Sequence, residues 1–496
     1  MRRWPLEMSV AALVLLGSLR AQASPPADAP LADAPLAQQQ EQRSRMPADA
    51  PLANPINPHC QDCEVRPRPW TALGELMLTQ ALPSSFNIIL RDAEWARINA
   101  ASWAANLENP WQWDNNAFLN NQFSHPYHGS LYYNSARANG YDFWRSAPWA
   151  FGGSLMWELF GERWAPSPND LWNTSLGGIT LGETLWRVSS LVLDNEATGS
   201  ERVMREIGAA LINPVRGFNR LVDGHAWREG PNPPGFRPKR IMGLLDLGYG
   251  RSDGETLPGD SVKVDAAFLA GELLYGDPVS DLAGVPFSTF DGRLWLMSKQ
   301  EEGARRFSLL QARGSLHAWR LSHGGEDGAQ HFLATYITYD YFSTPSLDYG
   351  GQGFAVGPVS RWGAMGPVRF ETELLATPMP IAAVRSDYFV TEEGRDYDYG
   401  IGMGGRAEMR LLFAGRARLK AAGRYLWEPI LSGYNGNHQQ LSLDVEARFF
   451  VIGQVGLGAA ATWYRRNSQY DAFPDVNRTG REIRVFASLA GPRWTP

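Results

Sequence analysis

The sequence predicts an α+β protein in which an N-terminal helical domain is followed by a C-terminal antiparallel transmembrane β-barrel of roughly 12 strands. Three observations predict this class: a signal-like N-terminus, apolar residues at helical spacing, and strict apolar-polar alternation in the second half of the chain. The 496 residues are also too many for one small domain. We therefore expect a signal peptide at 1–23, a disordered Pro/Ala-rich linker at 24–69, the helical domain at 70–230 and the barrel at 235–496.

The N-terminus is typical of a secretory signal peptide. Arg2 and Arg3 precede a short apolar stretch over residues 8–19, and Ala-Gln-Ala at 21–23 forms a small-x-small cleavage site. The apolar stretch is shorter than the ~20 residues that a membrane-spanning helix needs. We expect cleavage and export to the outer membrane of a Gram-negative bacterium. Because the removed segment carries a net +2, the net charge falls from -6 to -8, which does not favour nucleic-acid binding.

The linker repeats Ala-Asp-Ala-Pro-Leu-Ala at 27–32 and 48–53 and offers little apolar surface for a core. The two cysteines of the chain, Cys60 and Cys63, lie within it. In an oxidising compartment we expect them to form a disulfide. A redox dithiol and half of a metal site are the alternatives, but a redox motif should open a helix in a βαβ unit, and no helix is predicted here.

The helical domain is predicted from apolar and aromatic residues at helical spacing in 70–82, 85–105, 129–162 and 168–193. None of these stretches is long and apolar enough to cross a bilayer. We therefore expect a compact helical domain, or helices that plug the lumen of the barrel or cap its periplasmic end.

The barrel is predicted from a two-residue period that begins near residue 235. In the clearest case Leu441, Leu443 and Val445 alternate with Asp444 and Glu446. A soluble sandwich also alternates, and a soluble periplasmic two-domain protein is the alternative. Strands of roughly 10–15 residues, against a usual ~5–6, favour the barrel, as does the fully charged polar face, which suits a lumen.

Three motifs lie between residues 118 and 187. They are Asn-Gln-Phe-x-His-Pro-Tyr at 121–127, Gly-Ser-x-x-Trp-Glu at 153–158 and Pro-Ser-x-Asn-Asp at 166–170. On these motifs the region from roughly 105 to 220 resembles a bacterial family described as domain of unknown function 3943. The resemblance implies an outer-membrane protein and no particular activity, which agrees with the barrel predicted from alternation.

Four residues of this region are candidates for chemistry: His125, His128, Glu158 and Asp170. Two histidines three residues apart share a helix face, and with a carboxylate they could bind zinc. However, Pro126 makes a regular helix there doubtful, and no His-Glu-x-x-His motif occurs. A hydrolase would use Ser124 or Ser154 with a histidine and an acid, but neither serine lies in a Gly-x-Ser-x-Gly motif. We expect no metal and no cofactor.

A structural role is the favoured interpretation, because buried charges are costly unless they are paired. The carboxylates and arginines would pair with each other or with lumen residues such as Arg410, Arg418 and Arg448, and His125-Pro126-Tyr127 would form a fixed turn. The asparagines would cap helices and close turns. The predicted structural network comprises Asn121, Arg137, Asn139, Glu162, Asn173, Glu183 and Arg187.

The expected function is non-enzymatic: envelope structure, or the passage or binding of a small or lipidic ligand. The expected partners are outer-membrane lipid, the barrel assembly machinery and that ligand, with no nucleic acid. The alternative is an enzyme that acts on envelope lipid or glycan with His125, His128, Glu158 and Asp170.

Overall fold

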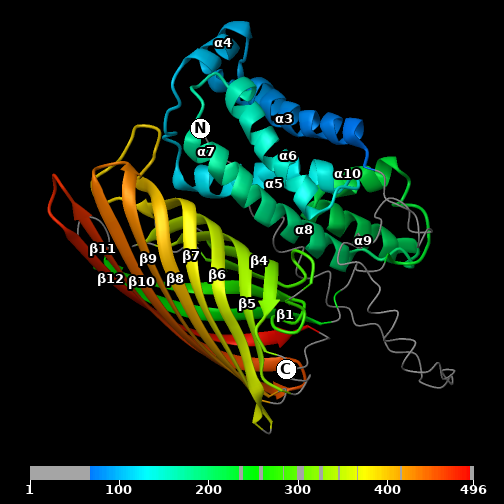
Figure 1. The fold of residues 1–496 in the computed structure, drawn as a ribbon, viewed down its shortest axis with the longest axis vertical. Helices are drawn as coiled ribbons and strands as arrows, with labels where there is room; N and C mark the ends of the chain where they lie inside the picture. Colours follow the sequence, from blue (N-terminus) through cyan, green and yellow to red (C-terminus); the bar gives the residue numbers. More distant parts are fainter. Residues whose placement is uncertain are drawn as a thin grey trace.

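The computed structural model describes residues 67–491, apart from 234–237, 239, 256–260, 283, 299–306, 323–327, 345–346, 366 and 414–415. Helices precede a closed barrel of 12 antiparallel strands, so the predicted fold class is confirmed (Figure 1). The predicted signal peptide, most of the predicted linker, and Cys60 and Cys63 lie outside the described residues.

The helices differ from the expected stretches in where they break. α3 runs through Pro83 and ends at Asp92, whose φ is 53°. The stretch 129–162 is divided into two helices at Gly140, which has a φ of 92° that favours glycine. The helical elements are α3 (Pro69–Arg91), η1 (Glu94–Ala96), α4 (Ala100–Glu108), η2 (Asn120–Ser124), α5 (His125–Arg137), α6 (Phe143–Met156), η3 (Trp157–Gly161), α7 (Pro168–Trp172), η4 (Asn173–Gly177), α8 (Gly178–Val192), α9 (Gly199–Ile212) and α10 (Pro214–Val222).

The expected turn at His125-Pro126-Tyr127 is wrong, because all three residues belong to α5. Pro126 lies in the first turn of the α-helical segment, where a missing N–H costs little. The preceding turn, η2, is π-helical, and such wider turns often lie beside irregularities of the hydrogen-bond ladder. Among the described residues, no helix combines the length and the hydropathy required to cross a membrane.

The barrel closes through β1 and β12, which pair from Leu244 and Ala490 to Gly254 and Gly480. We call the end where β1 begins and β12 ends the proximal end, and the opposite end the distal end. The strands are β1 (Ile241–Glu255), β2 (Ser261–Tyr275), β3 (Phe290–Met297), β4 (Phe307–Arg320), β5 (Gln330–Ser343), β6 (Asp348–Met365), β7 (Val368–Arg385), β8 (Tyr397–Phe413), β9 (Ala417–Ser432), β10 (Gly436–Ile452), β11 (Val455–Tyr470) and β12 (Val476–Ala490).

The two faces of the barrel wall follow the alternation in the sequence. On β10, Leu443 and Val445 are about half exposed on the outer surface, whereas Glu446 and Arg448 are buried in the lumen. Exposed large apolar side chains recur on the outer faces of the other strands, such as Leu374 on β7 and Leu457 on β11. This apolar exterior is what a lipid bilayer requires of a spanning barrel.

The helices pack on the outer wall of the barrel and not in its lumen, so the predicted plug is wrong. On β5 the outward-facing Leu333 is exposed, while Tyr339 and Tyr341 on the same face are covered by the helices. Phe118 and Leu181 of the helical domain join these tyrosines in one apolar cluster. Figure 1 shows the helices gathered along one side of the barrel, next to β4 to β7.

Val279 and Leu282, from the segment between β2 and β3, lie inside the proximal end of the lumen. Val279 and Leu282 are 1% exposed and pack against inward-facing side chains of β5, including Phe332 and Tyr336. Part of a barrel loop thus packs on the inner face of the wall at this end.

Candidate functional site

A buried ion-pair network holds α5 against α8. Glu183 accepts hydrogen bonds from Arg137 Nε at 2.9 Å, Arg187 Nε at 2.8 Å and the Tyr133 hydroxyl at 2.7 Å. Burial alone would raise the pKa of the Glu183 carboxyl, but Arg137 and Arg187 hold it at about 2. Glu183 is therefore ionised, and these contacts join the two helices.

A second polar group ties α3 to α5 and α10 through Glu75, which sequence reasoning missed. Asn139 Nδ2 and Asn219 Nδ2 donate to Glu75 Oε2 at 2.8 and 2.9 Å. Burial raises the pKa of the Glu75 carboxyl to about 7, although both asparagine hydrogen bonds lower it. The residue lies among apolar neighbours of an amphipathic helix, so nothing in the local sequence marks it.

Four carboxylates lie close enough to influence one another's protonation; we call Asp114, Glu158, Glu162 and Asp170 the carboxylate cluster. Burial raises the pKa of Glu158 to about 8, and burial followed by the neighbouring acids raises the pKa of Glu162 and Asp170. Glu158 Oε2 accepts from the Ser167 backbone N–H at 2.8 Å. Among the described residues, Glu158 Oε1 has no hydrogen-bond partner.

The two candidate histidines face different neighbours. His125 Nε2 lies 3.8 Å from Asp170 Oδ1, and its Nδ1 lies 3.2 Å from Thr174 Oγ1. His128 instead has its Nε2 2.9 Å from the Thr79 carbonyl oxygen of α3, and burial lowers its pKa to about 4. The structure therefore brings His125 to the carboxylate cluster and turns His128 toward α3.

Neither expected chemistry assembles around these residues. No group of three His, Cys, Asp or Glu side chains within the described part of the chain could hold a metal ion. Ser154 Oγ lies 3.5 Å from the Leu171 carbonyl oxygen, and this contact does not involve a histidine. At 3.8 Å, His125 Nε2 and Asp170 Oδ1 are neighbours that are not joined by a direct hydrogen bond.

The motif residues also fasten the helical domain to the barrel. Asn121 Nδ2 donates to the Tyr397 hydroxyl at 2.8 Å, and Asn169 Nδ2 donates to the Tyr399 hydroxyl at 3.1 Å. Asn173 reaches the same Tyr399 hydroxyl at 3.4 Å. Both tyrosines share the outer face of β8 with the exposed Ile401, so these bonds lie on the outside of the barrel.

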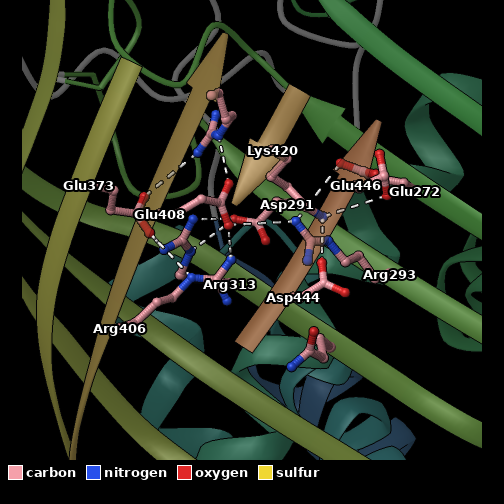
Figure 2. Close-up of polar contacts among 12 residues, drawn as sticks. Glu272, Asp291, Arg293, Arg313, Glu373, Arg406, Glu408, Lys420, Asp444 and Glu446 are labelled. Atoms are coloured by element: carbon pink, nitrogen blue, oxygen red, sulfur yellow. Dashed lines mark hydrogen bonds and ion pairs between the residues drawn. The ribbon is translucent and has the colours of Figure 1, made fainter. Parts of the chain in front are cut away.

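The lumen holds a dense network of ion pairs (Figure 2). Arg418 bridges Glu272 and Glu446, each at 2.7 Å, and Arg410 Nε lies 2.6 Å from Glu408 Oε1. Of the two expected pairings, Glu183 follows the first and pairs with Arg137 and Arg187 of the helical domain, whereas Arg410 and Arg418 pair within the barrel. Arg448 also pairs within the barrel, with Asp246 and Glu446. These charges are paired within the lumen because acids and bases stand on facing strands.

One small cavity lies within this network. A cavity of about 30 Å³ lies between Asp340, Arg406 and Arg424, which is room for roughly one or two water molecules. Ion pairs such as Arg418–Glu272 and Arg313–Glu373 join opposite sides of the wall at this level of the lumen. The fold therefore defines a closed β-barrel of the outer-membrane type with a helical domain on its outer wall.

Residues 110–215, the part that forms most of the helical domain, match the family described as "Domain of unknown function (DUF3943)". The resemblance that the motifs indicated is thus confirmed over this region. A comparison with curated proteins finds no match to the chain.

Solved outer-membrane barrels resemble about half of the chain. The COG4313 outer membrane channel from Pseudomonas putida F1 is 11% identical, covers 51% of this chain and 96% of its own, and has a TM-score of 0.28. The outer membrane protease OmpT from Escherichia coli is 11% identical over 51% and 97%, with a TM-score of 0.19. OccK7 (OpdD) from Pseudomonas aeruginosa is 12% identical over 52% and 100%, with a TM-score of 0.22. Similarity this low does not extend to function.

Proposed function

We propose that this protein is a non-conducting outer-membrane barrel that anchors a helical domain beside it, and that the helical domain binds a lipidic ligand of the envelope. The observation that carries the proposal is the docking of the helices on the outer wall, through Tyr339, Tyr397 and Tyr399. The rest of that wall is apolar and suits contact with lipid. A helical domain held against this outer wall is exposed to the same lipid as the wall.

The outer surface of the helical domain supports a lipidic ligand. Ile89 and Leu90 at the end of α3 are 75% and 69% exposed, and Met204 and Ile207 on α9 are 63% and 50% exposed. Large exposed apolar side chains that cluster on one domain mark a binding surface for an apolar partner. Acyl chains are the apolar partner that a membrane supplies to a domain fixed beside a spanning barrel.

The ion pairs across the lumen argue against passage of a ligand through the barrel. An aqueous pore needs an open polar channel, whereas here arginines and carboxylates from facing strands meet across the lumen. In planar bilayers the full protein is therefore expected to show no single-channel conductance. The control is a variant with Arg313→Ala and Glu373→Ala, which removes one ion pair across the lumen. Channels formed by this variant would show that the barrel inserts into the bilayer. Stable channels in the unchanged protein would contradict the proposal.

Ligand binding can be tested by native mass spectrometry of the full protein released from envelope lipid by a mild detergent. Bound phospholipid or glycolipid masses are expected on the unchanged protein. Met204→Glu with Ile207→Glu on the exposed stripe of α9 should reduce them several-fold. Thr198→Glu with Ser200→Glu adds the same charge at exposed positions beside the helix start and should not. Equal lipid retention in both double variants would count against the surface.

A second candidate function, an enzyme acting on envelope lipid or glycan, is supported by the position of His125 3.8 Å from Asp170 and by Glu158 Oε1, which has no hydrogen-bond partner among the described residues. His125→Gln and Asp170→Asn in the full protein are the discriminating variants. Changed lipid or glycan composition of the envelope, with a barrel that still shows heat-modifiable gel mobility, would favour the enzyme. Unchanged composition would favour the binding role.

A further inference from the structure

The distal end of the lumen contains a serine, a histidine and an aspartate in hydrogen-bond contact. His438 Nδ1 lies 2.8 Å from Ser468 Oγ, and His438 Nε2 lies 3.0 Å from Asp398 Oδ2. The three residues come from β10, β11 and β8, and each is 0% exposed. They share the inner face of the wall with Glu408 and Glu446, so the group points into the lumen.

We propose that Ser468, His438 and Asp398 form a nucleophilic site that hydrolyses carboxylic esters at the distal end of the barrel. A serine hydroxyl becomes a nucleophile when a neighbouring imidazole can take its proton and a third group orients that imidazole. Both contacts are present here. The proposal does not depend on the helical domain or on its ligand.

Carboxylate oxygens without hydrogen-bond partners distinguish this group from the ion-pair network of Figure 2. Glu428 lies opposite His438 in the pairing of β9 with β10, is 0% exposed, and neither of its carboxyl oxygens has a hydrogen-bond partner among the described residues. Asp398 Oδ1 is also without a partner there. By contrast, each of the six carboxylates labelled in Figure 2 contacts an arginine or lysine.

Buried acceptors without donors are costly and call for a partner that supplies the donors. A hydroxyl or ammonium group on the alcohol part of an ester would supply them to Glu428 and Asp398. This places the donor-bearing part of the substrate beside β8 and β9, and leaves Ser468 facing the ester bond.

An aromatic cover lies over the group. Tyr470 stacks edge-on against His438 with ring centres 5.8 Å apart, and Tyr388 contacts Tyr470 at 5.1 Å. Phe473 lies 4.7 Å from Tyr388 and 4.6 Å from Tyr434. Tyr470 is the last residue of β11, and the other three rings come from the distal loops before β8, before β10 and before β12. An apolar acyl chain fits such a cover, so the substrate class is an acyl ester with a donor group on its alcohol.

Ester hydrolysis at this group has two steps, acylation of Ser468 and hydrolysis of the acyl-serine. Ser468 Oγ forms a bond to the ester carbonyl carbon while its proton passes to His438 Nδ1, and Asp398 stabilises the imidazolium. The C–O bond to the alcohol breaks, and the alcohol leaves with the proton from His438. Water then attacks the acyl-serine, again losing its proton to His438, and returns Ser468 with release of the carboxylic acid. Ser468 and His438 are catalytic residues in this scheme, and Asp398 is a positioning residue.

The chain offers a matched control. His331 Nδ1 lies 2.8 Å from Ser360 Oγ, also across a strand pair, but on the outer wall. Within the described residues, His331 forms no ion pair with a carboxylate, whereas His438 pairs with Asp398. If Ser468 is reactive and Ser360 is not, the reactivity therefore requires the aspartate in addition to the serine–histidine contact.

The test uses the full protein, folded in detergent and checked by heat-modifiable mobility, with a fluorophosphonate probe and with 4-nitrophenyl esters of short and long acids. We expect the probe on Ser468, identified by peptide mass, and ester hydrolysis that Ser468→Ala removes and Ser360→Ala leaves unchanged. Asp398→Asn and His438→Gln should each slow labelling at least about 100-fold. Tyr434→Ala, which opens the cover, should speed it.

Two results would overturn the proposal. One is no labelling of Ser468 in either the unchanged protein or the Tyr434→Ala variant while both barrels stay folded. The other is labelling whose rate is the same in the Asp398→Asn and His438→Gln variants as in the unchanged protein. Either result would make the contacts a cross-strand packing feature of the lumen.

Discussion

Glu183 on α8 and Arg137 on α5 form a fully buried ion pair, with Arg137 Nε 2.9 Å from Glu183 Oε2. Glu183→Gln would leave Arg137 and Arg187 buried without a countercharge. We expect it to lower the free energy of unfolding of the helical domain by about 3–5 kcal/mol, measured by chemical denaturation in detergent. Glu201→Gln breaks the more exposed pair with Arg205 and should cost less than about 1 kcal/mol. A similar loss in the free energy of unfolding for both variants would show that the buried ion pair of Glu183 adds no more stability than the exposed one.

A second prediction concerns the close approach of α5 to η4 and α8. A Cβ on Gly129 would lie 1.8 Å from the Thr174 carbonyl oxygen, and a Cβ on Gly178 would lie 2.7 Å from Gly129 Cα. Gly129→Ala should therefore separate the helices and expose them to protease. Gly74→Ala on α3 meets no atom within 4 Å and should stabilise its helix by about 0.5–1 kcal/mol. Protease resistance of the Gly129→Ala protein equal to that of the unchanged protein would refute this packing.

A third prediction follows from the carboxylate cluster. Burial raises the pKa of Glu158 from its ordinary 4.5 to about 8, so its neutral form is favoured in the folded state. Its contribution to stability is complete below pH 4.5 and is lost as the pH rises toward about 8, at up to about 1.4 kcal/mol per pH unit.

Glu158→Gln keeps a neutral side chain at every pH. We expect the melting temperature of this variant to fall less between pH 5 and pH 8 than that of the unchanged protein. The remaining acids of the cluster, Asp114, Glu162 and Asp170, keep part of the pH dependence. Parallel melting curves for both proteins over this range would show that Glu158 is ionised throughout.

The barrel could be predicted from sequence because alternation records the environment of each side chain. Leu443 and Val445 face outward and Glu446 faces the lumen, as their two-residue period requires. The lumen partners could not be predicted, because Arg418 and Glu272 are 146 residues apart and no local pattern joins them.

The position of the helical domain was missed for a similar reason. Outward aromatic residues such as Tyr339 and Tyr397 fit a lipid-facing wall as well as a wall covered by helices. The local pattern does not distinguish the two. His438 and Ser468 are 30 residues apart and Asp398 is 40 residues from His438, so their contact also left no motif.

The most direct test of the central claim is a disulfide between the helical domain and the outer wall. A Cβ on Gly350, on the outer face of β6, would lie 2.8 Å from Gln122 Cγ. In a Cys60→Ser, Cys63→Ser background, Gln122→Cys with Gly350→Cys should cross-link on oxidation. Gln122→Cys with Tyr349→Cys, whose side chain points into the lumen, should not. Cross-linking to position 349 and not to 350 would place the helices inside the barrel and contradict the account.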